Sequence, residues 1–185
     1  MAPPGPVERV VLLDAGHRPI GTAPKSEVHT AQTPLHLAFS CHVFAPDGQV
    51  LVTRRSLAKK AWPGVWTNSV CGHPAPGESS RDAVRRRAGY ELGLGLGIVQ
   101  EVMPEFAYRA VDASGIVENE FCPVHFALAD GLPAPRASEV AEYHWVAPAD
   151  LAAAVAATPW AFSPWLVLQL GQLAARGIDY TAPRP

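Results

Sequence analysis

The stretch Gly72-His-Pro-Ala-Pro-Gly-Glu-Ser-Ser-Arg-Asp-Ala-Val-Arg-Arg-Arg-Ala-Gly-Tyr-Glu-Leu-Gly93 decides most about how this chain folds. Its second half is typical of an α-helix. Ser79 stands three residues before Asp82, which is a weak form of the capping box, and Gly93 is suited to close the C-terminus. We therefore predict a helix over residues 79–92. Gly89 inside it costs about 1 kcal/mol of helix stability relative to alanine.

Short apolar runs on both sides of this helix predict strands. An edge strand over residues 10–13 is followed by residues 22–36, which we expect to be loop with one helical turn. Further strands are predicted over residues 37–44, 49–53, 99–103, 106–111, 116–128 and 143–146. Pro46-Asp-Gly48 predicts a hairpin turn between the first two of these. Residues 94–100 and 132–137 are expected to be loops.

Two helices near the C-terminus, over residues 148–157 and 164–176, are predicted because each run begins with proline in its first turn. Strands, a central helix, more strands and terminal helices favour an α+β or α/β sandwich over a regular βαβ alternation. A length of 185 residues fits a single domain.

Composition excludes several classes of protein. The formal net charge of −2 gives no global basic field for nucleic acid, and no apolar run reaches the roughly 18 residues of a membrane helix. Three cysteines form no disulfide framework. The proline-rich residues 1–6 are expected to be a disordered stub and not a signal peptide. We expect a cytoplasmic protein with reduced thiols.

Three histidines and two carboxylates are candidate metal ligands: His29, His36, His73, Glu118 and Glu120. Glu118 and Glu120 share one face of a predicted strand, where two carboxylates repel each other unless they are protonated or bridged by a cation. A set of nitrogen and oxygen ligands suits Zn²⁺ or Mn²⁺. The alternative is five unconnected polar groups, since the spacing alone does not bring them together.

Cys71 is a candidate reactive group. A thiol whose pKa is lowered by a nearby cation or metal acts as a nucleophile or base. The alternative, which composition alone favours, is a buried cysteine that packs as a small apolar side chain.

Two other residue classes suggest an anionic or cationic ligand. Basic residues gather in three short stretches and match a diphosphate, although solvated surface charge is the alternative; they are Lys25, Arg54, Arg55, Lys59, Lys60, Arg86 and Arg87. Tryptophan rings attract cations, although core packing fits most of them; the four in proline-rich contexts are Trp62, Trp66, Trp160 and Trp165.

The stretch 72–94 resembles the Nudix motif. The matching positions are Gly72, Glu78, Arg86, Glu91 and Gly93. Arg87 and Tyr90 stand where that motif has acidic residues. In Nudix hydrolases these carboxylates gather Mg²⁺ at a pyrophosphate, so their absence here weakens the case for hydrolysis.

Several segments, in the same chain order, resemble type 1 isopentenyl-diphosphate isomerases of the Nudix superfamily. They include Thr33-Pro-Leu-His-Leu-Ala-Phe-Ser40, Trp66-Thr-Asn-Ser-Val-Cys-Gly-His73, Gly115-Ile-Val-Glu-Asn-Glu120 and Thr158-Pro-Trp-Ala-Phe-Ser-Pro-Trp165. The likeness runs from about residue 10 to about residue 170. It implies a Nudix-type α/β/α sandwich with a mixed sheet in a single domain 1–185. Its parts would be an N-terminal metal-ligand extension 7–33, a Nudix core of about 34–168 and a C-terminal helix 164–176.

The resemblance implies a reversible proton shift between isopentenyl and dimethylallyl diphosphate in isoprenoid biosynthesis. His29, His36, His73, Glu118 and Glu120 would bind one Zn²⁺ or Mn²⁺. Glu91 would hold one Mg²⁺ with the substrate diphosphate. Lys25, Arg55, Lys59 and Arg87 would contact the phosphates.

It also implies four catalytic residues. Glu120, hydrogen-bonded to Tyr108, and Cys71 would exchange protons from opposite faces of the substrate, with the donor in the forward direction left open. Trp160 would stabilise a tertiary carbocation through its ring. Water would have to be excluded, because it would trap that cation as an alcohol.

Two other functions remain as alternatives. One is a Nudix hydrolase that cleaves a nucleoside or prenyl diphosphate, and the other is a non-enzymatic module that binds a metal or a diphosphate. The expected partner is a small prenyl diphosphate, homologous or methylated forms included. Neither nucleic acid nor membrane is expected as a partner, and we expect a monomer or weak homodimer.

Overall fold

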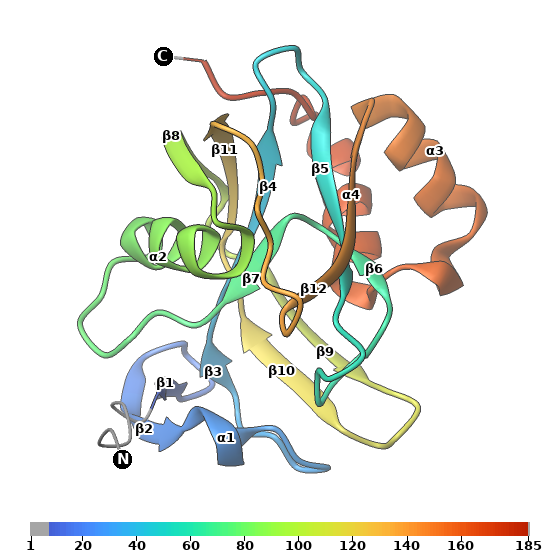
Figure 1. Ribbon diagram of the computed structural model, residues 1–185. Helices are drawn as coiled ribbons and strands as arrows, with labels where there is room; N and C mark the ends of the chain where they lie inside the picture. The colour runs from blue at the N-terminus through green and yellow to red at the C-terminus, as the bar shows by residue number, and fades with distance from the viewer. Residues whose placement is uncertain (1–7, 185) are drawn as a thin grey trace.

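The structure is a computed structural model that describes residues 8–184 (Figure 1). The strands are β1 Arg9–Leu13, β2 Pro19–Pro24, β3 His36–Leu37, β4 Phe39–Phe44, β5 Val50–Arg55, β6 Trp66–Thr67, β7 Val70–Gly72, β8 Gly95–Met103, β9 Ala107–Val111, β10 Val117–Phe121, β11 Val124–Asp130 and β12 Val140–Val146. The helices are α1 Lys25–Val28, α2 Ser80–Leu92, α3 Pro148–Ala157, the short 3₁₀ helix η1 Pro159–Ala161, and α4 Pro164–Ala175.

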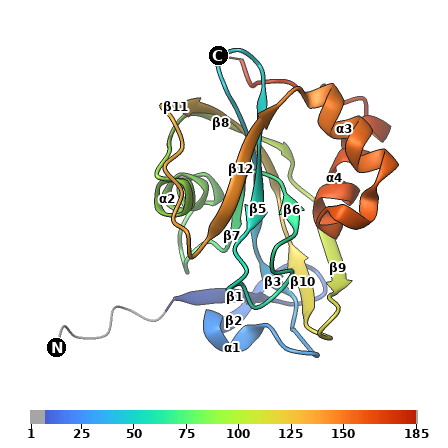
Figure 2. The ribbon, with the colours of Figure 1, turned by 45° about the vertical axis from the view of Figure 1, so that its right-hand side comes forward.

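The larger sheet is the middle layer of the molecule. Its strand order is β12-β5-β4-β11-β8, with β6 paired to β5 and β7 paired to β4. β4 and β11 run parallel while their other neighbours are antiparallel, so the sheet is mixed. Helix α2 covers one face, and α3 and α4 cover the other (Figures 1 and 2). The α/β/α sandwich expected from the sequence is confirmed.

The side chains of β4 alternate between the two faces of this sheet. Phe39, Cys41 and Val43 pack in the cluster that includes Val84 and Leu92 of α2. Phe44 packs in the other cluster, which contains apolar residues of α3 and α4. Because successive side chains of a strand point to opposite faces, one buried strand supports two cores.

The smaller sheet, ordered β2-β1-β3-β10-β9, carries the N-terminal part of the chain. The chain passes from it into the larger sheet twice, between β3 and β4 and between β10 and β11. β3 and β10 are parallel, and their register sets His36 opposite Glu120. This pairing joins the segment before the Nudix-like region to the strand that carries the candidate carboxylates.

The structure corrects four sequence predictions. The strand expected over 116–128 is two strands in different sheets, divided at Pro123, which lacks the N–H that a continuous ladder needs. β1 is not an edge strand, because it lies between β2 and β3. Residues 22–36, expected to be loop with one helical turn, do contain that turn as α1, but they also include the end of β2 and the start of β3. Residues 95–98, also expected to be loop, extend the predicted strand 99–103 toward its N-terminus as part of β8, because pairing with β11 overrides the two glycines.

Other local predictions are confirmed. Ser79 caps α2 by accepting a hydrogen bond from the Asp82 backbone N–H, and Gly93 ends the helix at φ 59°. β4 and β5 form the expected hairpin. Helix α3 has the predicted bounds, and α4 ends at Ala175, one residue early.

The stub expected over residues 1–6 lies outside the described residues. Among residues 8–184, no helix is long and apolar enough to cross a membrane.

Candidate active site

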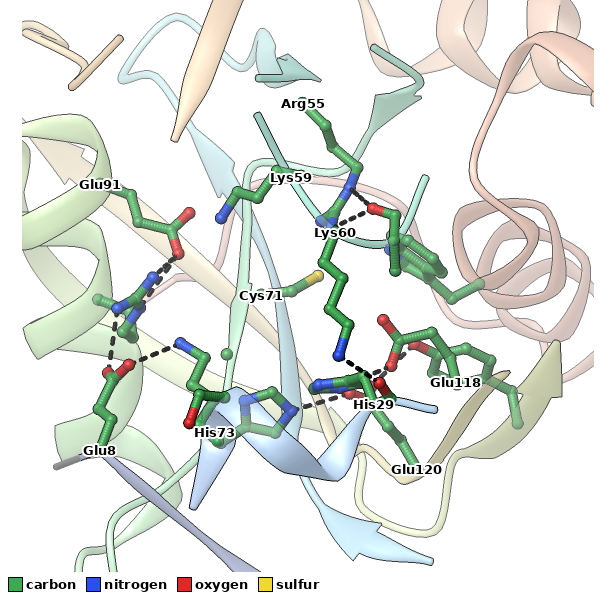
Figure 3. A pocket seen from close by; sticks show the side chains of 17 residues that line it. Glu8, His29, Arg55, Lys59, Lys60, Cys71, His73, Glu91, Glu118 and Glu120 are labelled. Carbon is green, nitrogen blue, oxygen red and sulfur yellow. Dashed lines mark hydrogen bonds and ion pairs between the residues drawn. The ribbon is translucent and has the colours of Figure 1, made fainter. Parts of the chain in front are cut away.

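A cavity of about 530 Å³ lies where the N-terminal segment meets β7, α2, β9 and β10. In Figure 3, Cys71 stands near the centre of the view, with His29, Glu118 and Glu120 to one side and Glu8 and Glu91 to the other. Polar residues dominate the lining, and Ala61, Tyr108 and Trp165 add apolar surface. The cavity therefore has a charged end and a histidine-rich end with a thiol between them.

Four of the five predicted metal ligands converge at one end of this cavity. One ligand atom from each of His29, His36, His73 and Glu120 lies within 4.8 Å of all the others. They come from the segment after α1, from β3, from the segment after β7 and from β10. Glu118 lies beside this group, with its Oε2 atom 3.1 Å from His29 Nε2.

The donor set fits a borderline divalent cation such as Zn²⁺ or Mn²⁺. His36 Nε2 lies 3.2 Å from His73 Nε2, and His73 Nε2 lies 3.0 Å from Glu120 Oε1. Glu118 Oε2 is buried, and its 3.1 Å approach to His29 Nε2 lacks the geometry of a hydrogen bond. Lone pairs that crowd together in a buried site are satisfied by a cation, and imidazole with carboxylate suits ions of this class.

The ionisation of these groups follows from burial and from their contacts. Burial lowers the pKa of His73 to about 4, which keeps the ring neutral, the form that binds metals. Burial opposes ionisation of Glu120, but hydrogen bonds from His36 and His73 outweigh it and hold the pKa well below its usual value. Burial, with repulsion from Glu120, raises the pKa of Glu118.

Tyr108 on β9 and Glu120 on β10 line the cavity side by side. The Tyr108 hydroxyl donates to Glu120 Oε2 at 2.8 Å, and burial raises the pKa of Tyr108 well above its usual value. The predicted contact between them is therefore present. Their strands are antiparallel neighbours, and the register sets the two residues opposite each other.

Cys71 on β7 lines the same cavity. Its Sγ atom lies 3.1 Å from Ser40 Oγ and 3.2 Å from Asn68 Oδ1. Burial raises the pKa of this thiol to about 11, so Cys71 is protonated at neutral pH in the free protein. Cys41 and Cys122, by contrast, are fully buried in the packed cores.

Comparisons with known proteins identify the family. Residues 34–166 match the family model described as the NUDIX domain. The isopentenyl-diphosphate Delta-isomerase of Kocuria rhizophila is 64% identical, covering 91% of this chain and 94% of the relative. That of Salmonella agona is 54% identical, covering 94% and 97%. The chain belongs to the isopentenyl-diphosphate Delta-isomerase family.

Solved structures support the Nudix fold of this isomerase-family chain. A protein from Deinococcus radiodurans matches with a TM-score of 0.68 at 21% identity, covering 89% of this chain and 98% of that one. A MutT protein from Methanosarcina mazei matches with a TM-score of 0.60 at 15% identity, covering 79% and 97%. At these identities the likeness concerns the fold alone.

In this isomerase-family chain the tryptophan that lines the cavity is Trp165, and not Trp160, to which the family resemblance gave the role. Trp160, on η1, is 84% exposed and does not line the cavity. Trp165, on α4, is 3% exposed and does line it. The Ser163 backbone N–H donates to the Trp66 carbonyl, which fixes the start of α4 against β6 and turns Trp165 inward. The two tryptophans stand five residues apart in similar proline-rich contexts, so nothing in the sequence indicated which of them would line the cavity.

The four predicted phosphate-binding residues all line the cavity of this isomerase-family member. The positively charged groups of these side chains already have partners within the chain. Lys25 pairs with Glu8 at 2.9 Å, Lys59 pairs with Glu139, and Arg87 pairs with Glu91. The Arg55 guanidinium donates to the Ala61 and Trp62 carbonyls and lies 5.4 Å from the Trp165 ring. Arg55 therefore braces the wall, whereas the other three line the charged end.

Glu8, Asn68 and Ser40 were not predicted from the sequence of this isomerase-family chain. Glu8 bridges Lys25 and Arg87, at 2.9 and 3.3 Å. Asn68 and Ser40 contact the Cys71 thiol. Nothing in their spacing pointed to these contacts, although Asn68 and Ser40 do fall within segments that carried the family resemblance.

Proposed function

We propose that this chain interconverts isopentenyl diphosphate and dimethylallyl diphosphate in isoprenoid biosynthesis. One observation carries the proposal. A single cavity holds the Tyr108–Glu120 pair and the Cys71 thiol, with a histidine cluster at one end and cations at the other. Relatives 54–64% identical over most of their length are named for this isomerisation.

The histidine cluster is proposed to hold one Zn²⁺ or Mn²⁺. His29, His36, His73 and Glu120 would be its ligands, with Glu118 as a fifth. A cation bound there would polarise the Glu120 carboxyl group and strengthen it as an acid. Glu120 Oε2 accepts the Tyr108 hydrogen bond while Oε1 lies 3.0 Å from His73 Nε2, so each oxygen of this carboxyl group has its own neighbour.

The charged end is proposed to bind the diphosphate. Lys25, Lys59 and Arg87 line it, Arg55 braces the neighbouring wall, and Glu91 would hold one Mg²⁺ with the substrate. A guanidinium and two ammonium groups suit phosphate oxygens. Arg87 replaces a Nudix acid, so this helix would bind the anion where hydrolases activate water.

The reaction is proposed to pass through a tertiary carbocation. One of Cys71 and Glu120 gives a proton to the alkene and the other removes a proton from the cation, and the two exchange roles in the reverse direction. The Trp165 ring, which lines the cavity, would stabilise the cation in place of Trp160. The segment 158–165, anchored by Ser163 to Trp66, would exclude water.

The molecular organisation is proposed as well. We infer a single domain 1–185, with a metal-ligand extension 7–33, a Nudix core of about 34–168 and a terminal helix 164–176. The match of residues 34–166 to the Nudix model supports this division. A cytoplasmic location, a monomer or weak homodimer, and a small prenyl diphosphate as the only partner belong to the same proposal.

Incubation with isopentenyl diphosphate in heavy water, with Mg²⁺ and Zn²⁺ or Mn²⁺ present, tests the proposed reaction. We expect dimethylallyl diphosphate that carries deuterium, detected by NMR or mass spectrometry. Cys71→Ala should lower the rate by more than about 100-fold. Cys41→Ala is the matched control, because Cys41 is buried against α2 and does not line the cavity.

Two results would refute the proposal. Release of phosphate from isopentenyl or nucleoside diphosphates without alkene isomerisation would establish a Nudix hydrolase instead. A loss of about tenfold or less in Cys71→Ala would remove Cys71 from proton transfer.

A further inference from the structure

The Asn68 side chain is the centre of a buried hydrogen-bond network between the two walls of the cavity. Asn68 is fully buried in the short connection between β6 and β7. Its Oδ1 atom accepts from Cys71 Sγ at 3.2 Å and from Trp165 Nε1 at 3.0 Å. The Thr67 hydroxyl donates to the same oxygen at 2.9 Å. A thiol on β7 and an indole on α4 thus share one acceptor.

The other end of the Asn68 amide is equally occupied. Its Nδ2 atom donates to the Cys41 carbonyl at 3.0 Å and to the Val70 carbonyl at 3.1 Å, with a longer contact of 3.4 Å to Ser40 Oγ. Every polar position of the side chain is therefore engaged. A buried amide satisfied on both ends is held rigidly, because leaving any of these groups unpaired costs free energy.

Only one orientation of this amide is chemically consistent. The indole N–H of Trp165 can only donate, and the carbonyls of Cys41 and Val70 can only accept. A flipped amide would set its NH₂ group against the indole and its oxygen against two carbonyls. The partners themselves thus establish that Oδ1 faces Cys71.

This orientation determines how Cys71 is held. The thiol hydrogen points to Asn68 Oδ1, and the Ser40 hydroxyl, which receives the weak contact from Asn68 Nδ2, is left to donate to Sγ. S–H is a weak donor, so the hydrogen can leave Oδ1 at low cost while the sulfur stays in place. Asn68 thereby holds the Cys71 sulfur atom in position and still allows the thiol to give up its proton.

We propose that Asn68 is a positioning residue that fixes the Cys71 sulfur and the Trp165 ring relative to one another in the cavity. The inference rests on the proposed isomerisation, in which Cys71 exchanges a proton and Trp165 faces the cationic carbon. Both groups must be aligned with the same substrate atoms, although they come from different elements. A shared, rigid acceptor couples their positions, and small misplacements of reacting groups reduce rates strongly.

Asn68→Ala and Ser69→Ala form a matched pair for testing this role. Ser69 is the next residue, 1% exposed, and its hydroxyl also makes two buried contacts, with the Val43 N–H and the Leu51 carbonyl. It touches neither Cys71 nor Trp165 in these contacts. We expect Asn68→Ala to lower kcat about 100-fold with KM for isopentenyl diphosphate nearly unchanged, because the phosphate-binding side chains are elsewhere. Ser69→Ala should keep kcat despite a comparable fall in Tm.

A second measurement reports on the sulfur without catalysis. Cys41 and Cys122 are 0% and 1% exposed, so iodoacetamide should alkylate Cys71 selectively, which mass spectrometry can verify. At one fixed pH, the alkylation rate of metal-loaded enzyme should change severalfold in Asn68→Ala, because the sulfur loses its fixed partner, and should stay at the wild-type value in Ser69→Ala. If Asn68→Ala does not fold, Asn68→Ser replaces it, since its hydroxyl is too short to contact both Cys71 and Trp165.

The outcomes separate this inference from the proposed function. An equal loss of kcat in both variants, a loss confined to KM, or unchanged alkylation in the Asn68 variant would each overturn the positioning role. Wild-type enzyme without isomerase activity would overturn the proposed function, and the alkylation rates would still decide whether Asn68 holds the thiol.

Discussion

At the scale of single residues, the choice of tryptophan is the clearest difference between sequence and structure. Trp160 and Trp165 belong to one segment, yet one is 84% exposed and the other 3%. We predict that Trp165→Phe lowers kcat by about tenfold or more, because it would weaken the proposed cation–π contact with the carbocation and removes the indole donor to Asn68.

Trp160→Phe is the matched control for that change. Its side chain lies in solvent, so kcat should remain within about twofold of wild type. Steady-state kinetics with isopentenyl diphosphate measures both variants. Equal losses in the two would show that the segment acts as a whole and not through the Trp165 ring.

The proposed metal ligands belong to the same scale. We expect a chelator to abolish isomerisation and added Zn²⁺ or Mn²⁺ to restore it. Loss of a residue that only supports a metal ligand weakens metal binding by about 10- to 100-fold. His73→Ala removes a proposed ligand itself, so it should weaken Zn²⁺ binding by more than that, measured by direct titration. His144→Ala, at an exposed histidine of β12, should leave the affinity unchanged. Full activity in metal-free protein would exclude this site.

At the scale of elements, the C-terminal end of α2 holds in place the part of the helix that lines the charged end of the cavity. Gly93 takes φ 59°, and a Cβ atom there would lie 2.7 Å from the Ala134 carbonyl oxygen. The same region anchors the following loop, because the Arg136 N–H donates to the Glu91 carbonyl. Gly93→Ala should therefore destabilise the protein by at least about 1–2 kcal/mol, measured by denaturant unfolding.

Gly89 offers the opposite prediction within the same helix. It is exposed, and nothing lies within 4 Å of the position that an added methyl group would take, so alanine fits without strain. Gly89→Ala should stabilise the protein by about 0.5–1 kcal/mol, because the unfolded chain loses freedom and the helix gains propensity. A destabilised Gly89→Ala would contradict the unstrained helical position of Gly89, and an unaffected Gly93→Ala would contradict the assignment of Gly93 as the helix end.

At the scale of the whole molecule, His42 joins three parts of the fold. It lies on β4, its Nε2 atom is 2.9 Å from Gln169 Oε1 of α4, and its Nδ1 atom is 2.7 Å from the Tyr180 hydroxyl near the C-terminus. Burial lowers its pKa from 6.5 to about 4, despite the Gln169 contact. The neutral ring donates to Gln169 and accepts from Tyr180, so protonation disturbs all three elements at once.

The pH dependence of stability follows from this lowered pKa. Between pH 6.5 and 4 the unfolded chain takes up a proton at His42 that the folded protein does not, so stability falls as the pH falls. The stability that depends on a neutral His42 is fully present above about pH 6.5. By pH 4 the free energy of unfolding has fallen by on the order of 3 kcal/mol through this group. His42→Phe should unfold more easily at neutral pH but show a shallower decline in this window, measured by urea unfolding at several pH values.

His144→Gln provides the control for this prediction. The His144 side chain is 61% exposed on β12, so its replacement leaves the buried contacts of His42 with Gln169 and Tyr180 intact. A slope in His42→Phe as steep as in the wild type would assign the acid sensitivity to other groups.

Local elements and the family could be predicted from the order of residues alone. Helix α2 with its caps, the β4–β5 hairpin and the starts of α3 and α4 depend on neighbours a few residues apart, so local propensity and turn chemistry were enough. The resemblance of ordered motifs indicated the same family that the relatives later identified. The candidate ligands were also found, but only as separate positions in the chain.

Which of these positions meet depends on the three-dimensional fold. His36 faces Glu120 because β3 and β10 pair in parallel, and Trp165 replaces Trp160 in the cavity because Ser163 docks on β6. The division of residues 116–128 between two sheets, and the convergence of Cys71 and Trp165 on Asn68, likewise depend on long-range contacts. Such contacts are set by the packing of distant segments, and no local pattern of residue types encodes them.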